Sequence, residues 1–345
     1  MTDFEELTDL ASERLGGAVL LANDEFFAPK EALLKAHPPE WREGEYTERG
    51  KWMDGWETRR RRSPGYDWCI LRLGAPGVVR GVVVDTRFFR GNFPESCSVE
   101  ACAVDGLAAP ERLLDAATQW TLLLPRSPLE GDSPNRFEIP ATARATHLRL
   151  NIFPDGGVAR LRVHGEVSPR WTRFARGGGE VELAGLENGG WVISCSDMFF
   201  GHRQNLILPG RSRFMGDGWE TRRRRGPGHD WSIVRLAAPG VLHRVEIDTD
   251  HFRGNAPAHF TLEGMPAEAA DADNPEADPD AVGLAEREAD WRMILPATPL
   301  LPHARHSFEE GISAAGPLTH VRLNIFPDGG VARLRVFGTL ASTVR

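Results

Sequence analysis

The chain contains one long sequence twice. The stretch "RLNIFPDGGVARLRV" at residues 149–163 recurs without a change at residues 322–336. The stretch "DGWETRRRRSPGYDWCILRL" at residues 54–73 returns as "DGWETRRRRGPGHDWSIVRL" at residues 217–236, with sixteen of twenty positions identical. The shared motifs have the same order in both halves, and solenoid repeats are much shorter, with periods of roughly 20–50 residues. The duplication therefore predicts two homologous domains.

A chain of 345 residues is also longer than a usual single domain. We predict a first domain over residues 1–168 and a second over residues 169–345, joined near "SPRWTRFARGGGE". The first half has a longer segment before Asp54, including "HPPEWREGEYTERGK", which is predicted to be a loop from its Pro, Gly and charge content. The second half has its own predicted solvated loop, "AEAADADNPEADPDAVG".

Apolar and polar residues alternate in most of the shared motifs, as they do in half-buried strands. In "THLRLNIF", Leu148, Leu150 and Ile152 face one way and the polar residues between them face the other. The 36 glycines and 25 prolines favour many turns. We predict an all-β chain of two tandem antiparallel β-sandwiches, with a short helix only at the N-terminal "EELTDLASERL". The Asp-Gly of "FPDGG", between two predicted strands, is typical of a β-hairpin, and that hairpin resembles the closing one of galactose-binding-like jelly rolls.

Charge and cysteine content exclude several classes of protein. The formal net charge of −8 argues against a nucleic-acid binder, because such domains present a basic face. The four cysteines form no CxxC pair, which favours reduced thiols and a cytoplasmic location. No apolar run is long enough to span a bilayer, and the acidic N-terminus has no apolar core of a secretory signal. We therefore expect no nucleic-acid and no membrane partner.

The arginine run of each half, Arg59–Arg62 and Arg222–Arg225, has two readings. Unpaired charge cannot line both faces of a buried strand, so the run is an edge or loop, or its arginines meet carboxylates. One reading is a structural network with nearby acids such as Asp54, Glu57 and Asp67. The other is a site in which the planar guanidinium fork binds the carboxylate of a small substrate.

Five stretches together identify a family. "NDEFFAPKEALL", "KWMDGWETRRRR", "GYDWCILRLG", "DTRFFRGNFPESCSVEA" and the duplicated "LNIFPDGGVARLRV" closely resemble allantoicases, in order, from about residue 15 to residue 340. The resemblance implies tandem jelly rolls. It also implies hydrolysis of allantoate to (S)-ureidoglycolate and urea in purine degradation. Two non-enzymatic readings stay open, a tandem carbohydrate-binding or small-ligand-binding jelly-roll protein and a structural adaptor.

Polar residues kept in both halves are the candidate site, because allantoate is a small anion with two ureido groups. Loss of urea needs a proton on the leaving nitrogen and an activated water, which carboxylates can supply. The expected acid–base residues are Asp54, Glu57 and Asp85. The expected substrate-binding residues are Arg59, Arg61, Arg90, Asn92, Asn151 and Asp155, although Asp155 and Asn92 are also ordinary turn residues. The second-half equivalents are Asp217, Glu220, Asp248, Arg222, Arg224, Arg253, Asn255, Asn324 and Asp328.

Metal use and assembly stay open at this point. A divalent metal could activate the water instead of a carboxylate, but no residue spacing demands a metal site. A homo-oligomer is expected, since a site could form between domains or between subunits.

Overall fold

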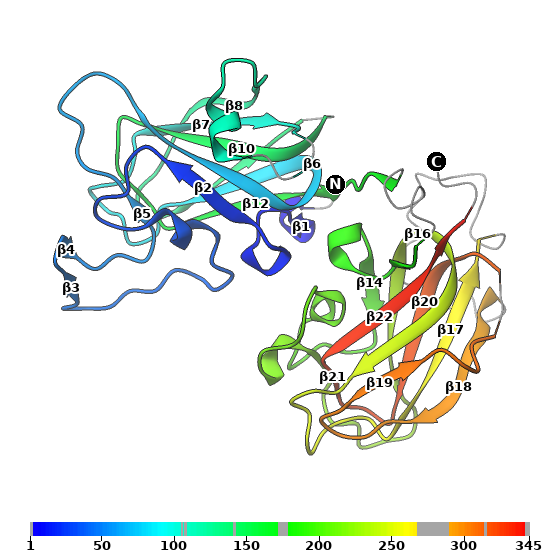
Figure 1. Ribbon diagram of the computed structural model, residues 1–345. Helices are drawn as coiled ribbons and strands as arrows, with labels where there is room; N and C mark the ends of the chain where they lie inside the picture. The colour runs from blue at the N-terminus through cyan, green and yellow to red at the C-terminus, as the bar shows by residue number, and fades with distance from the viewer. Residues whose placement is uncertain are drawn as a thin grey trace. The chain divides into compact units, whose positions relative to one another are not determined.

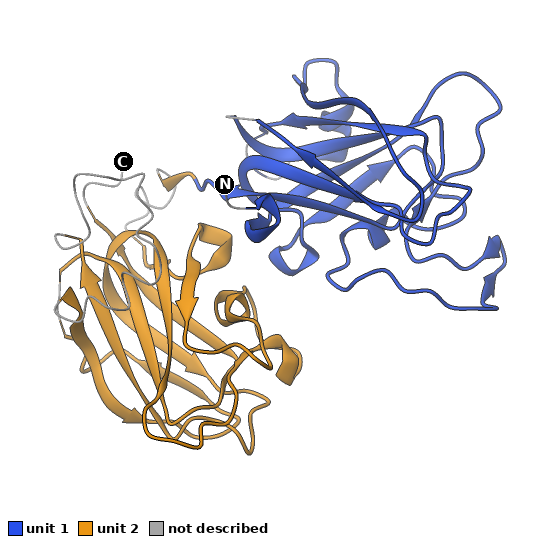
Figure 2. Ribbon diagram, turned by 180° about the vertical axis from the view of Figure 1, so that it is seen from behind, with its two compact units in different colours: residues 1–169 blue, residues 170–345 orange. Residues whose placement is uncertain are grey.

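A computed structural model gives the fold. It describes residues 3–104, 106, 109–140, 143–171, 179–267, 290–313 and 316–341. The chain forms two compact units, residues 1–169 and residues 170–345 (Figure 2). The predicted acidic loop lies almost wholly outside the described residues, and so does the middle of the predicted junction "SPRWTRFARGGGE". Among the described residues, no helix is long and apolar enough to cross a bilayer.

Unit 1 is built from β-strands and short 3-10 helices. Its strands are β1 (Thr8–Asp9), β2 (Ala18–Ala22), β3 (Tyr46–Thr47), β4 (Gly50–Lys51), β5 (Trp56–Glu57), β6 (Asp67–Asp85), β7 (Ser96–Cys102), β8 (Thr121–Pro128), β9 (Pro134–Glu138), β10 (Arg144–Phe153), β11 (Gly157–Val158) and β12 (Arg160–Val167). Its 3-10 turns are η1 (Phe4–Glu6), η2 (Glu13–Leu15), η3 (Lys30–Leu34) and η4 (Pro110–Leu114).

Unit 2 repeats this plan. Its strands are β13 (Val181–Glu182), β14 (Trp191–Cys195), β15 (Trp219–Glu220), β16 (Asp230–Asp248), β17 (His259–Pro266), β18 (Arg292–Pro299), β19 (Arg305–Phe308), β20 (Leu318–Phe326), β21 (Gly330–Val331) and β22 (Arg333–Leu340). Its 3-10 turns are η5 (Leu186–Asn188), η6 (Arg203–Ile207) and η7 (Met215–Asp217).

One long strand connects the two layers of each sandwich (Figure 1). The first part of β6 pairs with β2 on one side and β10 on the other, and β10 continues the layer to β7 and β8. After "GAPG", the second part of β6 pairs with β9 and β12, and β1 adds to β12. In unit 2, β16 has the same role between β14, β20, β19 and β22. The prediction of two tandem antiparallel β-sandwiches is confirmed.

The alternating apolar residues form the core between the layers. Leu148, Leu150 and Ile152 of β10 are fully buried, as are Leu161 and Val163 of β12. Burying such a side chain stabilises the fold by about 1.5–3 kcal/mol. The fully buried Trp56, kept as Trp219 in unit 2, is a core residue rather than a ligand platform.

The predicted "FPDGG" hairpin is wrong. The strands on either side of it, β10 and β12, do not pair with each other, because both pair with β6. The two residues of β11 between them pair with β5 instead, so the chain passes from one layer to the other. Gly156 has a φ of 140°, and a Cβ on Gly157 would lie 2.0 Å from the Phe89 ring. Gly156 therefore allows a sharp bend of the backbone, and Gly157 allows the backbone to approach the Phe89 ring closely.

The predicted N-terminal helix is also wrong. Thr8 and Asp9 form the edge strand β1 on β12, where Oδ1 of Asp9 accepts a hydrogen bond of 3.0 Å from the Val163 amide. Ser12 then caps the separate turn η2, which ends at Gly16 with a φ of 89°. Backbone pairing with the sheet edge thus outweighs the helical spacing of the apolar residues.

Candidate functional site

The arginine run of unit 1 is a loop tied down at two of its four positions. Arg59 binds Asp24 through its side chain, with Nε 2.7 Å from Oδ2, and through its backbone amide. Nη1 of Arg61 lies 2.6 Å from Oδ1 of Asp67, which is buried, and the Arg61 amide donates to Asp155. Asp155, predicted to bind substrate or to serve its turn, thus holds the arginine loop in place. The structural network occurs, but its acids are Asp24 and Asp67 rather than Asp54 or Glu57.

The other two arginines of the run have free guanidinium groups. Arg60 and Arg62 are exposed, and within the described part of the chain no carboxylate pairs with either of them. Arg90, on the loop after β6, is 81% exposed in its side chain and forms only a surface ion pair of 3.0 Å with Asp132. Exposed pairs of this kind are weak and exchange readily. Arg60, Arg62 and Arg90 are therefore the guanidiniums that an incoming carboxylate can reach.

Asp54 lies in a buried ion-pair network. Its Oδ2 accepts from Nη2 of Arg160 at 2.5 Å, and both side chains are 1% exposed. Nζ of Lys35 lies 2.7 Å from the other oxygen, and the Glu40 amide donates at 3.0 Å. Although burial opposes ionisation, Arg160 and Lys35 outweigh it and lower the pKa of Asp54 to about 2. Asp54 is therefore a fixed anion at neutral pH, which suits a structural role better than proton transfer.

Asp85 is neutralised in a similar way by a neighbour on its own loop. It is buried at the end of β6, and Arg87 binds it through the backbone amide at 2.9 Å and through Nε at 2.8 Å. Charge-assisted hydrogen bonds of this kind fix the position of a carboxylate. The geometry therefore favours a loop-anchoring role for Asp85, and its predicted catalytic role stays a prediction.

Glu57 differs from both of these acids. It is half-buried in β5, and its Oε1 accepts a hydrogen bond of 2.7 Å from Nδ2 of Asn92. Burial raises the pKa of Glu57, and the Asn92 hydrogen bond offsets this only in part. Phe27 lies next to it, since the Phe27 amide donates to the Glu57 carbonyl. A partly desolvated carboxyl group with an uncharged partner keeps its proton to higher pH than a solvated one, which suits general acid–base catalysis.

Asn151 belongs to a different cluster, on the outer face of the sheet. It is buried and donates to Ser98 Oγ at 3.0 Å and to Glu100 Oε2 at 2.9 Å. Arg149 binds the same Glu100 oxygen at 2.7 Å and lies over the Trp120 ring. In unit 2, Asn324 makes the equivalent bonds to Thr261 and Glu263. The structure therefore places Asn151 in this cluster rather than in the Glu57–Asn92 pair. Its Nδ2 is hydrogen-bonded, whereas its buried Oδ1 has no hydrogen-bond partner among the described residues.

Unit 2 keeps the same arrangement around its own copy of the run. The amides of Arg222 and Arg224 donate to Asp197 and Asp328, and Arg224 also pairs with Asp230. Asn255 Nδ2 lies 2.6 Å from Glu220 Oε1. Asp217 forms an ion pair of 3.3 Å with Arg333, as Asp54 does with Arg160 in unit 1. Arg253, the counterpart of Arg90, is exposed.

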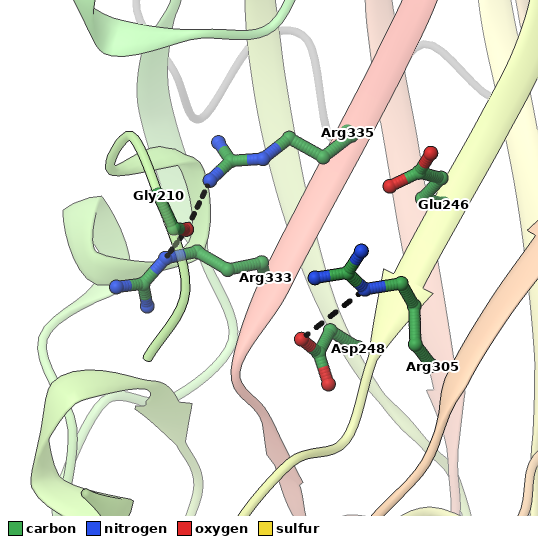
Figure 3. A pocket seen from close by; sticks show the side chains of 6 residues that line it. All are labelled: Gly210, Glu246, Asp248, Arg305, Arg333 and Arg335. Carbon is green, nitrogen blue, oxygen red and sulfur yellow. Dashed lines mark hydrogen bonds and ion pairs between the residues drawn. The ribbon is translucent and has the colours of Figure 1, made fainter. Parts of the chain in front are cut away.

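Asp248 lies in a pocket of unit 2 (Figure 3). The pocket is lined by Gly210, Glu246, Asp248, Arg305, Arg333 and Arg335. Arg305 Nε lies 3.9 Å from Asp248 Oδ2, whereas Arg333 and Arg335 both donate to the Gly210 carbonyl. Two of the three guanidiniums thus anchor the loop after η6 to the sheet. In unit 1 the position of Glu246 is Val83, and Arg87 covers the equivalent Asp85.

Potential metal ligands do not gather at any of these places. Among the described residues, no group of three or more His, Cys, Asp or Glu side chains is arranged to hold a metal ion.

Comparison with known proteins identifies the family. The model of the Allantoicase repeat matches residues 8–168 and 181–341. The chain belongs to the allantoicase family. A probable allantoicase of Pseudomonas aeruginosa (strain UCBPP-PA14) is 47% identical over 336 residues, which cover 97% of each chain. Probable allantoicase 1 of Burkholderia mallei (strain ATCC 23344) is 46% identical over 332 residues, covering 96% of this chain and 94% of that protein.

A solved allantoicase has the same fold. The crystal structure of allantoicase from Saccharomyces cerevisiae superimposes with a TM-score of 0.76 at 33% identity, covering 96% of this chain and 93% of that one. The resemblance read from the shared motifs is thus confirmed for both allantoicase repeats.

Several residues of this allantoicase that matter to the site were missed by sequence reasoning. Arg160 and Glu100 recur as Arg333 and Glu263, so their repetition was a usable signal. Lys35 has no such signal, because the matching position in the second repeat is Leu208.

Proposed function

We propose that this chain hydrolyses allantoate to (S)-ureidoglycolate and urea, as a step of purine degradation. Membership of the allantoicase family supports the substrate. The single observation that supports the chemistry is the Glu57–Asn92 pair, a half-buried carboxyl group of raised pKa at the loop end of unit 1. The other two predicted acids, Asp54 and Asp85, form ion pairs with Arg160 and Arg87.

Glu57 would act first as an acid and then as a base. It donates its proton to the ureido nitrogen that leaves the central carbon, and urea departs as that C–N bond breaks. The lone pair of the remaining ureido nitrogen supports the positive charge that develops on the carbon. Water then adds to the carbon and gives a proton back to the Glu57 carboxylate. One water is consumed and the enzyme regains its starting protonation state.

The substrate carboxylate would be bound by the accessible arginines. Arg59 and Arg61 already hold Asp24 and Asp67, so their task is to shape the loop. Arg60, Arg62 and Arg90 are free to form charge-assisted hydrogen bonds with an anion. Asn92 keeps its amide oxygen for a ureido N–H while its nitrogen holds Glu57.

The carbohydrate-binding alternative has one observation in its favour. Phe26 and Phe27 are partly exposed as an edge-to-face pair, and Phe199 and Phe200 repeat this pair in unit 2. Such aromatic side chains are what a sugar-binding platform needs. An uncharged sugar does not need the accessible guanidinium groups of Arg60, Arg62 and Arg90, however, so the hydrolytic proposal accounts for more of the structure.

Location and assembly are part of the same proposal. We propose a cytoplasmic enzyme, which agrees with four free cysteine thiols. The homo-oligomer expected from the sequence is retained as a proposal, and size-exclusion chromatography with light scattering tests it.

Glu57→Gln tests the assignment of the acid. Because general acid–base catalysis contributes about 10²–10⁴-fold, kcat for urea release should fall by about 100-fold or more. Thermal unfolding should be unchanged, since glutamine can still accept from Asn92. A variant with nearly normal turnover would show that Glu57 is not the acid.

A further inference from the structure

We infer that the two repeats are not equivalent. Unit 1 carries the working site, whereas in unit 2 the side chain of Met215 covers the equivalent glutamate–asparagine pair. This inference rests on the proposed function, since it says where the proposed reaction takes place.

The pair itself is the same in both units. Asn92 donates to Glu57 at 2.7 Å, and Asn255 donates to Glu220 at 2.6 Å. The two glutamates occupy matching two-residue strands, β5 on β11 and β15 on β21. Any difference in function must therefore come from what surrounds the pair.

A methionine covers the pair in unit 2. The Sδ of Met215 lies 3.8 Å from Nδ2 of Asn255, the same nitrogen that binds Glu220. Asn255 is consequently half-buried, whereas Asn92 is exposed. A thioether is a weak acceptor on a flexible apolar side chain, so it fills the space that a polar ureido group would need.

The segment that carries Met215 differs in length from its counterpart in unit 1. In unit 1 the long loop before Asp54 forms an arm with the short β3–β4 hairpin (Figure 1). Trp52 of this arm stands at the position of Met215, and Arg42 packs on its ring, with Cζ 4.6 Å from the ring centroid. The shorter segment of unit 2 closes directly into the turn η7, which starts at Met215.

A second, independent change makes the neighbouring loop of unit 2 less suited to an anion. Asp250 stands in the place of Arg87, and it binds His303 Nδ1 at 2.8 Å and Arg211 Nη2 at 3.1 Å. Its neighbour His251 stands in the place of Phe88. The guanidinium at this loop position of unit 1 is thus absent from the same position of unit 2, where a carboxylate stands instead.

The test compares matched substitutions in the full chain, Glu57→Gln and Glu220→Gln. We expect Glu220→Gln to release urea from allantoate at no less than about 80% of the wild-type rate, and Glu57→Gln to lose at least 100-fold. A loss of half or more of the rate in Glu220→Gln would overturn the inference. Circular dichroism and thermal unfolding verify that both variants fold.

Binding stoichiometry gives a second readout that does not depend on turnover. The Glu57→Gln chain should bind allantoate at one site per chain in isothermal titration calorimetry, and two equal sites would contradict the inference. A wild-type chain that releases no urea refutes the proposed function instead, so the two failures are distinguishable.

Discussion

Nδ2 of Asn92 donates a hydrogen bond of 2.7 Å to Oε1 of Glu57, and these two residues lie in separate loop-end motifs that both recur in the second repeat. Burial raises the pKa of Glu57, while this hydrogen bond lowers it. Asn92 thus limits how far the Glu57 carboxyl is shifted and fixes where its proton is delivered.

Asn92→Ala should therefore move the pH dependence of the reaction. Without the hydrogen bond, the pKa of Glu57 rises further, so the protonated form persists to higher pH. The limb of the kcat/KM profile that reports Glu57 should shift to higher pH, with a lower maximum rate. Asn255→Ala is the matched control in the second repeat and should leave the profile in place. An unshifted limb in Asn92→Ala would show that the pair does not control the titrating group.

Asp54→Asn should destabilise unit 1 strongly. The substitution leaves Arg160 as a buried charge without its anion, and breaking a buried pair in this way costs about 3–5 kcal/mol. Unfolding in guanidinium chloride, followed by tryptophan fluorescence, measures the effect. The double variant Asp54→Asn with Arg160→Met should recover part of the loss. A change below about 1 kcal/mol in the single variant would contradict a structural role for Asp54.

The same pair predicts a loss of stability in acid. The folded-state pKa of Asp54 is depressed from 3.8 to about 2, so the stabilisation is fully present above pH 3.8 and is lost as the pH falls through 2. A shift of this size corresponds to about 2 kcal/mol. The unfolding free energy of the wild type minus that of Asp54→Asn should decline over this window. A difference that is independent of pH would rule out Asp54 as the titrating group.

Arginines of one run should respond differently to substitution. Arg60→Ala and Arg62→Ala should each raise KM for allantoate by about 10- to 100-fold, because a charge-assisted hydrogen bond contributes about 1.5–3 kcal/mol. They should leave stability within about 0.5 kcal/mol, as exposed side chains do. Arg61→Ala should lower the unfolding temperature instead, because the buried Asp67 loses its ion-pair partner. If Arg60→Ala and Arg62→Ala lowered stability and Arg61→Ala raised only KM, the proposed roles would be contradicted.

The sequence predicted the architecture better than the partners of individual residues. Duplication and alternation are local properties of the chain, so they predicted two β-sandwiches and a core that contains Leu148 and Leu150. The predictions of the hairpin and of the N-terminal helix were wrong because pairing with a distant strand outweighed the local sequence pattern. In the first case β10 pairs with β6, and in the second β1 pairs with β12.

The candidate site shows the same limit. Glu57 and Asn92 were both singled out by their repetition, but nothing in the sequence pairs them. Arg59 meets Asp24 and Asp54 meets Arg160, and these partners are far apart along the chain. Which acid is neutralised and which is free to transfer a proton therefore depends on the folded structure.

Urea release from allantoate by the purified wild-type chain tests the central claim most directly. We predict one urea and one (S)-ureidoglycolate for each allantoate consumed, measured by a coupled urea assay and chiral chromatography. Parallel reactions with a chelator and with added divalent metal determine whether a metal contributes. No urea above the uncatalysed rate in any of these reactions would contradict the assignment of this chain as an allantoate hydrolase.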